Sequence, residues 1–166
     1  MEKYELGIAV QKIYDFLWDE LCDWYIEIAK VRLWKAEEDP KAANEALWTL
    51  RTALTQGLKL LHPFMPFITE EIYCTLMGDE EISIMVSEWP KYKESRNFAE
   101  DEAKVERIKE AVKGIRNIRG EMNVPPSKKA SVIVVSEKEE VLKIFEENKV
   151  FFATLGLASD VTLQST

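Results

Sequence analysis

The sequence predicts a mainly α-helical protein: a helical bundle over residues 1–126, followed by a small α/β segment over residues 127–166. Two observations predict this fold class. Apolar residues recur every three or four positions through most of the chain, which is the period of helices with one buried face. Two short β-branched runs in the last 40 residues indicate strands. The length of 166 residues, with 46% apolar and 31% charged residues, is typical of an ordinary soluble globular protein.

The first predicted helix runs from about Glu5 to Lys35. Its main apolar stripe is Leu6, Val10, Ile13, Leu17, Leu21, Trp24, Ile28 and Val31. A second apolar stripe beside it is Tyr14, Trp18, Cys22 and Tyr25. Because two stripes require contacts on two sides, as in a bundle, we expect both Trp18 and Trp24 to lie in the core.

The second predicted helix begins at Pro40 and continues to about Leu61. Asp39 can cap it, and Pro40 is tolerated at the first helical position because the N–H that it lacks would have no partner there. Gly57 lowers the helix propensity, so close packing against a neighbouring helix is its expected role. The prolines of segment 62–66 then break the helix.

Two further helices and a mixed tail complete the chain. The helices span about 66–77 and 98–120, and the residues between them, about 78–92, are expected to be irregular or extended. The inward face of the longer helix is predicted to be Val105, Ile108, Val112, Ile115, Ile118 and Met122, with Pro125 and Pro126 ending it. The tail is predicted to hold strands at 130–135 and 161–163. Between them we expect a helix at 137–147 and a second short helix that Asn148 can cap and that ends at Gly156.

The sequence contains no recognisable catalytic or metal centre. His62, the only histidine, lies between a helix end and a proline, where a structural role towards the terminal carbonyls is favoured. The six glycines are scattered and form no phosphate-binding loop. Cys22 and Cys74 form no CxxC pattern, which favours free thiols and a cytoplasmic location. We therefore expect no catalytic residue, metal site or cofactor in this chain, and, since no apolar run approaches about 18 residues, no membrane partner.

Positive charge gathers in one segment of an otherwise acidic chain. The net charge of −8 argues against indiscriminate nucleic-acid binding, but residues 104–129 carry eight positive and three negative side chains. The candidates for phosphate contacts on one helix face are Lys109, Lys113, Arg116 and, at its border, Arg119. The alternative is a solvated face balanced by Glu106 and Glu110.

Aromatic residues provide a second set of candidates. Trp34 and Trp48 lie near the ends of predicted helices, where their rings can stack on unpaired bases. The alternative is that both side chains belong to the core.

Four segments occur in an order that carries a family resemblance. They are WDELCDWYIEIAK (18–30), LLHPFMPFITEEIY (60–73), SIMVSEWP (83–90) and IRNIRGEMNVPPSKK (115–129). Together they resemble the anticodon-binding region of valyl-tRNA synthetases, which are class I aminoacyl-tRNA synthetases. The Cys-Asp-Trp-Tyr and Ser-Ile-Met…Trp-Pro pieces separate this family from its isoleucyl and leucyl relatives. The resemblance covers residues 5–130, and the tail resembles the small α/β segment that follows the family's bundle.

The resemblance implies a bundle that binds the anticodon arm of tRNA-Val. The full enzyme attaches valine to this tRNA in a separate domain that uses ATP and Mg²⁺. The His-x-Gly-His and Lys-Met-Ser-Lys-Ser signatures of that domain are absent here, so we expect no enzymatic activity from this chain alone. The family's bundle also has a helix before Glu5 that is largely missing, and its absence is expected to expose Tyr14 and Trp18.

The expected partners follow from the same resemblance. They are tRNA-Val and the remaining domains of the synthetase, with no DNA and no membrane. Two alternatives stay open: a helical adaptor that binds another protein through its aromatic faces, and the equivalent domain of an isoleucyl or leucyl relative.

Overall fold

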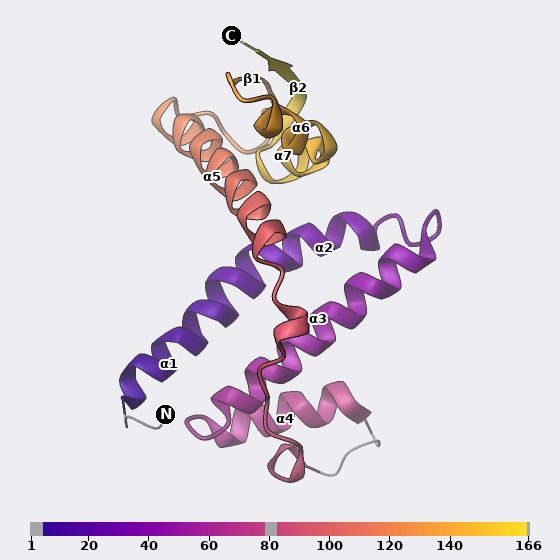
Figure 1. The fold of residues 1–166 in the computed structure, drawn as a ribbon, viewed down its shortest axis with the longest axis vertical. Helices are drawn as coiled ribbons and strands as arrows, with labels where there is room; N and C mark the ends of the chain where they lie inside the picture. The colour runs from indigo at the N-terminus through magenta and orange to yellow at the C-terminus, as the bar shows by residue number, and fades with distance from the viewer. Residues whose placement is uncertain (1–4, 79–82, 166) are drawn as a thin grey trace. The chain divides into compact units, whose positions relative to one another are not determined.

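The structure is a computed structural model that describes residues 5–78 and 83–165. The chain forms two compact units, residues 1–92 and residues 93–166. The first unit is helical, and the second contains one long helix and a small α/β motif, so the predicted fold class is confirmed (Figure 1). Helix α5 (Ala99–Glu121) belongs to the second compact unit, whereas the sequence grouped it with the bundle. The boundary predicted after residue 126 stays a prediction, since compact units and family boundaries need not coincide.

The first helix is continuous, as predicted, but its middle is not α-helical. It consists of α1 (Leu6–Asp15), the π-helix η1 (Phe16–Tyr25) and α2 (Ile26–Leu33). The backbone amide of Ile26 donates to the carbonyl of Leu21, five residues earlier, which is the hydrogen bond of a π-helix. The main apolar stripe nevertheless continues through the π-helix, since Leu21 and Trp24 are buried there.

The two tryptophans of this helix differ in burial. Trp24 is buried, as predicted. Trp18 is 57% exposed and stacks on Tyr14, with the ring centroids 6.3 Å apart. The prediction of a core position for Trp18 is therefore wrong, because the second stripe to which it belongs, with Tyr14 and Cys22, is exposed in the described part of the chain. The exposure of Tyr14 and Trp18 that the family resemblance implied is confirmed.

Helix α3 (Pro40–Leu61) begins and ends where the sequence predicted. The carboxylate of Asp39 accepts the amide of Ala42 at 3.0 Å and so caps the helix. Helix α3 packs against η1 and α2, and the Tyr25 hydroxyl donates to the Ala46 carbonyl at 3.2 Å. A Cβ atom at Gly57 would lie 2.5 Å from Cδ2 of Leu17, which confirms the predicted close approach of two helices.

Helix α4 (Pro66–Met77) and the 3-10 turn η3 (Ile84–Val86) close the first unit. Leu58, Tyr73 and Ile84 form a buried cluster that joins α3, α4 and η3. The segment before η3 was predicted to be irregular, but residues 79–82 lie outside the described residues.

In the second unit, the 3-10 turn η4 (Glu94–Arg96) precedes α5. Helix α5 ends before Pro125 is reached, because Asn123 adopts a left-handed conformation (φ 52°), which asparagine tolerates at a helix end. The inward face predicted for this helix is only partly correct. Ile108 and Val112 are buried, but Ile118 and Met122 are exposed.

The C-terminal motif has the order β1 (Ala130–Val135), α6 (Glu139–Glu147), α7 (Lys149–Leu155) and β2 (Ala158–Gln164). The strands pair in parallel, with Val132 opposite Val161. Phe145 and Phe152 meet edge to face beneath them, with centroids 5.1 Å apart. Asn148 holds the predicted position before α7, but its side-chain amide donates back to the Ile144 carbonyl instead of capping the helix. None of the helices within residues 5–78 and 83–165 is long and apolar enough to cross a membrane.

Candidate nucleic-acid interface

The four cations predicted on one face of α5 fall into two pairs. Lys113 and Arg116 are exposed, whereas Lys109 and Arg119 are buried. The Lys109 ammonium lies 2.6 Å from a carboxylate oxygen of Glu106, so the predicted balance by acidic neighbours holds at this position. A phosphate can therefore reach two of the four positions directly. Whether any of them binds nucleic acid stays a prediction.

Arg119 fixes the loop that follows α5. Its Nη2 donates to the carbonyls of Pro125, at 3.1 Å, and Lys128, at 2.5 Å. The backbone turns at Asn123, which has a positive φ. The two hydrogen bonds from Arg119 hold the residues that follow this turn against the end of α5. Lys128 and Lys129 at the end of this loop are exposed. These two lysines are candidates that the helical wheel missed, because a wheel stops where the helix stops.

Arg116 links α5 to the C-terminal motif. Its Nε donates to the carbonyl of Leu155, the last residue of α7, at 2.9 Å. Leu155 is followed by Gly156, where a Cβ atom would lie 3.5 Å from Cδ1 of Ile115. Arg116 thus has a structural contact through Nε in addition to an exposed surface.

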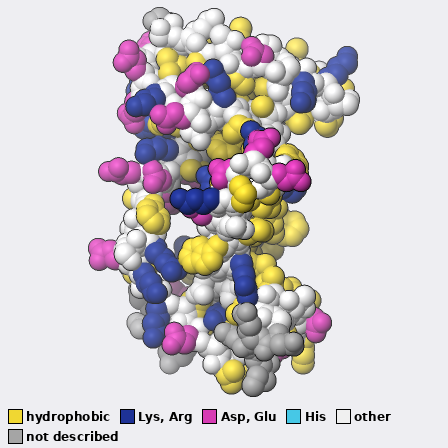
Figure 2. Space-filling model, turned by 90° about the vertical axis from the view of Figure 1, so that its right-hand side faces the viewer, with side chains coloured by type: hydrophobic (Ala, Val, Ile, Leu, Met, Phe, Trp, Pro, Cys, Tyr) yellow, Lys and Arg dark blue, Asp and Glu magenta, His cyan; other side chains and the backbone are white. Residues whose placement is uncertain are grey.

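Other charges of the second unit are paired across short distances. Arg107 of α5 lies 3.2 Å from Glu140 of α6. A hydrogen bond to Asp101 raises the pKa of Lys104 above its ordinary value. Figure 2 shows Lys and Arg side chains interspersed with Asp and Glu on the face that it displays. The positive segment of the sequence is therefore partly neutralised in the folded protein.

The aromatic candidates of the first unit are well exposed. Trp34, which ends α2, is 71% exposed, and Trp48 in α3 is 61% exposed. These exposures argue against the core alternative that the sequence left open. Sequence reasoning missed Phe67, which is 90% exposed in the first turn of α4. Pro66 could have indicated this exposure, because it begins a new helix. Side chains in the first turn of such a helix can face solvent on more than one side.

His62 takes the structural role that was predicted, with a different partner. Its Nδ1 lies 2.7 Å from the hydroxyl of Thr69, which is fully buried. The same hydroxyl lies 2.8 Å from the Met65 carbonyl, and the His62 tautomer that donates through Nδ1 allows both bonds to form together. The bond ties the end of α3 to α4. A terminal carbonyl was expected as the partner, but the Thr69 hydroxyl takes that place.

Glu70 holds the segment that carries η3. Its carboxylate accepts the amide of Ile84 at 3.1 Å. A hydrogen bond from the Ser83 side chain and, more weakly, the Ile84 amide lower the pKa of Glu70 below its ordinary value, against the opposing effect of desolvation. Burial and the nearby Glu70 charge raise the pKa of the Cys74 thiol. Among the residues with described positions, no group of three or more His, Cys, Asp or Glu side chains is placed to hold a metal ion.

Named relatives match nearly the whole sequence of the chain, and a known protein family matches most of it. Residues 1–134 match the model of a family described as the anticodon-binding domain of tRNA ligase. A valine–tRNA ligase of Clostridium acetobutylicum is 50% identical over 162 residues, and one of Clostridium tetani is 47% identical over 161 residues. A valine–tRNA ligase of Fusobacterium nucleatum is 42% identical over 163 residues. These matches cover 97–98% of the chain, and the chain spans 18% of the length of each of the three relatives.

Proposed function

The chain belongs to the family of anticodon-binding domains of tRNA ligases, and we propose on that basis that it is the part of a valine–tRNA ligase that binds the anticodon arm of tRNA-Val. The observation that carries the proposal is the 47–50% identity to two clostridial valine–tRNA ligases along nearly the whole chain. The chain spans 18% of the length of each of these two relatives, so the proposed role is that of one part of a longer protein. The parent protein would then attach valine to tRNA-Val in the cytoplasm with ATP and Mg²⁺, and this chain would supply binding.

Two kinds of exposed side chain support binding to an anticodon arm. Lys113 and Arg116 of α5, with Lys128 and Lys129 beyond it, present positive charge that phosphates attract. Trp34 and Trp48 present rings on which unpaired bases can stack. The anticodon loop is a single-stranded loop next to a duplex stem, so it offers both phosphates and unstacked bases.

The test is a titration of the isolated chain with purified tRNA-Val, tRNA-Ile and tRNA-Leu at about 50 and about 200 mM salt. We expect the highest affinity for tRNA-Val and a marked loss of affinity at the higher salt, because bound phosphates release counterions. Lys113→Glu should weaken binding and lower the salt slope by about one unit per lost contact. Lys143→Glu makes the same charge change at an exposed position of α6 and is the matched control.

Four results would contradict the proposal or an expectation that comes with it. Stronger binding to tRNA-Ile or tRNA-Leu would assign the chain to a related ligase. Equal effects of the two lysine variants would show that only the net charge matters. Binding to no tRNA by a folded chain would favour the helical adaptor. Valine-dependent pyrophosphate exchange by the isolated chain would overturn the expectation that it supplies no chemistry.

A further inference from the structure

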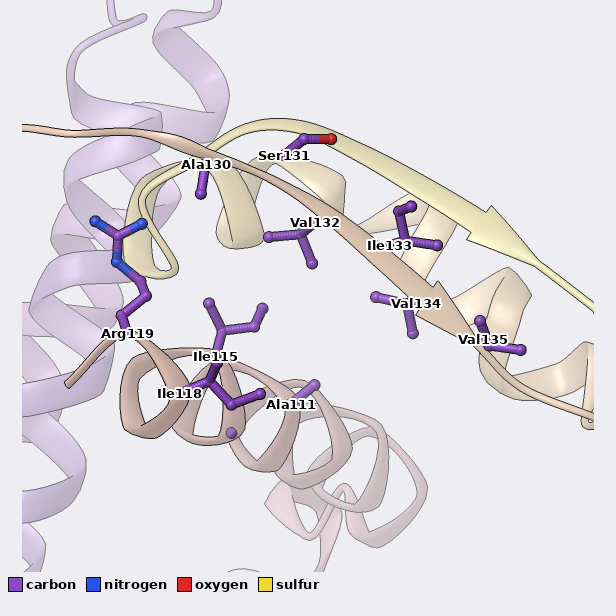
Figure 3. Close-up of a pocket in the computed structure, with 11 residues that line it drawn as sticks. Ala111, Ile115, Ile118, Arg119, Ala130, Ser131, Val132, Ile133, Val134 and Val135 are labelled. Carbon is purple, nitrogen blue, oxygen red and sulfur yellow. The ribbon is translucent and has the colours of Figure 1, made fainter. Parts of the chain in front are cut away.

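An apolar groove lies between α5 and β1 in the second unit. Its volume is about 470 Å³. All six residues of β1 line it on one side, and Ala111, Gly114, Ile115, Ile118 and Arg119 line it on the other. Figure 3 shows Val132 and Val134 projecting from the strand towards Ile115 and Ile118 of the helix. Since consecutive strand residues point to opposite faces, a groove that touches all six contacts the backbone of the strand as well as the side chains of one face.

The edge of β1 that lies away from β2 carries backbone groups without a strand to pair with. The amides of Ala130 and Ser136 donate to carbonyls next to and within β2. Backbone groups alternate in direction along a strand, so those of Ser131, Ile133 and Val135 point to the opposite edge. The sheet has two strands in the part of the chain that the structure describes, and this edge is therefore open there. An open edge is a template for another strand.

The groove also exposes more apolar surface than an isolated strand tolerates. Ile118 of α5 is 62% exposed, and Ile133 and Val135 of β1 are 61% and 55% exposed. Parallel sheets are normally covered on both faces, and a sheet of two parallel strands is small for independent stability. A further strand beside β1 would pair this edge and place its own side chains next to these residues, which would reduce their exposure.

Arg119 marks one end of the groove with an unsatisfied donor. Its side chain is more than nine-tenths buried, and its Nη1 has no hydrogen-bond partner among the described residues. Figure 3 shows the guanidinium directed towards Ala130, at the start of β1. A buried cationic N–H without a partner is costly, and an oxygen acceptor at this end would satisfy it.

The shape and chemistry of the groove favour an extended polypeptide as its occupant. A helix would leave the open edge of β1 unpaired, and a nucleic acid would meet apolar side chains with a single buried cation. The chain spans 18% of the length of the ligases that it resembles, so most of such a protein is available to supply a strand at high local concentration. We propose that the groove between α5 and β1 receives a third β-strand, rich in apolar residues and carrying an oxygen acceptor for Arg119, from another part of the same longer polypeptide.

This inference rests on the proposal that the chain is part of a longer ligase, but it does not depend on tRNA binding. The test compares backbone amide exchange in the 166-residue chain and in the full-length protein, both without tRNA, over peptides that cover residues 130–136. We expect the amides of Ser131, Ile133 and Val135 to exchange at least about tenfold more slowly in the full-length protein, which corresponds to about 1.4 kcal/mol. The amides of Val132 and Val134, which face β2 in both proteins, are the internal reference.

A pair of variants ties the protection to the groove. Ile118→Glu places a charge on the apolar wall at an exposed position, so the isolated chain should stay folded while the full-length protein loses the protection. Asn117→Glu makes a charge change at an exposed neighbour that does not line the groove, and should leave the protection intact.

Several outcomes would overturn the inference. Equal exchange of the three amides in both proteins would exclude a third strand. Protection that appears in the isolated chain and grows with its concentration would assign the groove to a second copy. Protection in the full-length protein only after tRNA is added would assign it to the nucleic acid. A chain that shows the protection but no tRNA binding would contradict the proposed function alone.

Discussion

Replacing Arg119 by methionine should destabilise the second unit by about 2 kcal/mol. Nη2 of Arg119 donates to two carbonyls, and each hydrogen bond from a charged group contributes about 1.5–3 kcal/mol. Pro125 and Lys128, which carry those carbonyls, are exposed, so water can hydrogen-bond to both carbonyls in the variant. We therefore take about 1.5 kcal/mol for each bond, and the loss of the two bonds costs about 3 kcal/mol. The variant also lacks the buried Nη1 that has no hydrogen-bond partner, and this stabilises the folded state by about 1 kcal/mol. Methionine keeps much of the packed stem, so little apolar contact is lost.

Urea unfolding followed by circular dichroism measures this effect. With a slope of about 2 kcal/mol/M, the transition of the second unit should move to lower urea by about 1 M. All five tryptophans lie in the first unit, so their fluorescence shows whether that unit changes as well. The control is Arg116→Met, which removes the hydrogen bond to the Leu155 carbonyl from an exposed residue and should cost less than about 1 kcal/mol. Equal shifts for both variants, or none, would refute the assignment of Arg119 to the loop.

Three further substitutions test other parts of the fold. Phe152→Ala removes a fully buried ring and should cost about 3–5 kcal/mol in the same urea assay; a cost below about 1 kcal/mol would show that Phe152 is not central to the core. Asp39→Ala removes the cap of α3 and should cost about 1 kcal/mol, measured by thermal unfolding against Asp160→Ala in β2. The charge of Glu70 stabilises the folded state above its ordinary pKa near 4.5, and this contribution is lost as the pH falls through the lower pKa of the folded state. The unfolding midpoints of wild type and Glu70→Gln should therefore differ at pH 7 and converge towards pH 3, and a constant difference would contradict this cause.

Helix positions could be predicted because each has a local signal. Asp39 and Pro40 determine where α3 begins, and the β-branched run from Ala130 to Val135 coincides with β1. Such signals depend on residues within a few positions of one another, so they are visible in one sequence. The close approach at Gly57 could be predicted for the same reason, since a glycine inside a helix needs a steric explanation.

The side-chain environments could not be predicted as well, because they depend on distant segments. The exposure of Tyr14 and Trp18 depends on which other segment packs against their stripe, and no residue within the stripe indicates that. Lys109 and Arg119 lie on a wheel face that looks solvated, yet Nη2 of Arg119 donates to carbonyls six and nine residues further along the chain. Ile118 was placed in the core because it is apolar and falls at helical spacing, but it is exposed.

Substitution of the exposed tryptophans tests base stacking separately from the binding of phosphates by positive charge. Trp34→Ala and Trp48→Ala remove exposed rings, so the stability of the chain should change by no more than about 0.5 kcal/mol. If a base stacks on either ring, that variant should lose about 1–3 kcal/mol of tRNA binding, or about 5- to 150-fold in affinity. Stacking releases no counterions, so the slope of affinity against salt should stay that of the wild type, unlike the slope of Lys113→Glu.

A matched pair of tRNAs makes the stacking test specific. An anticodon stem whose loop bases are held in a duplex should bind the wild type and the tryptophan variants equally, because no unpaired base is available to stack. Phe67→Ala is the comparison within the protein, since Phe67 is more exposed than either tryptophan but was not singled out by the sequence. If Phe67→Ala weakens binding to the intact loop and both tryptophan variants do not, the ring that contacts the bases lies at the start of α4. If all three bind like the wild type, exposed aromatic residues of the first unit do not contact the tRNA, and the positive residues of the second unit must account for the affinity.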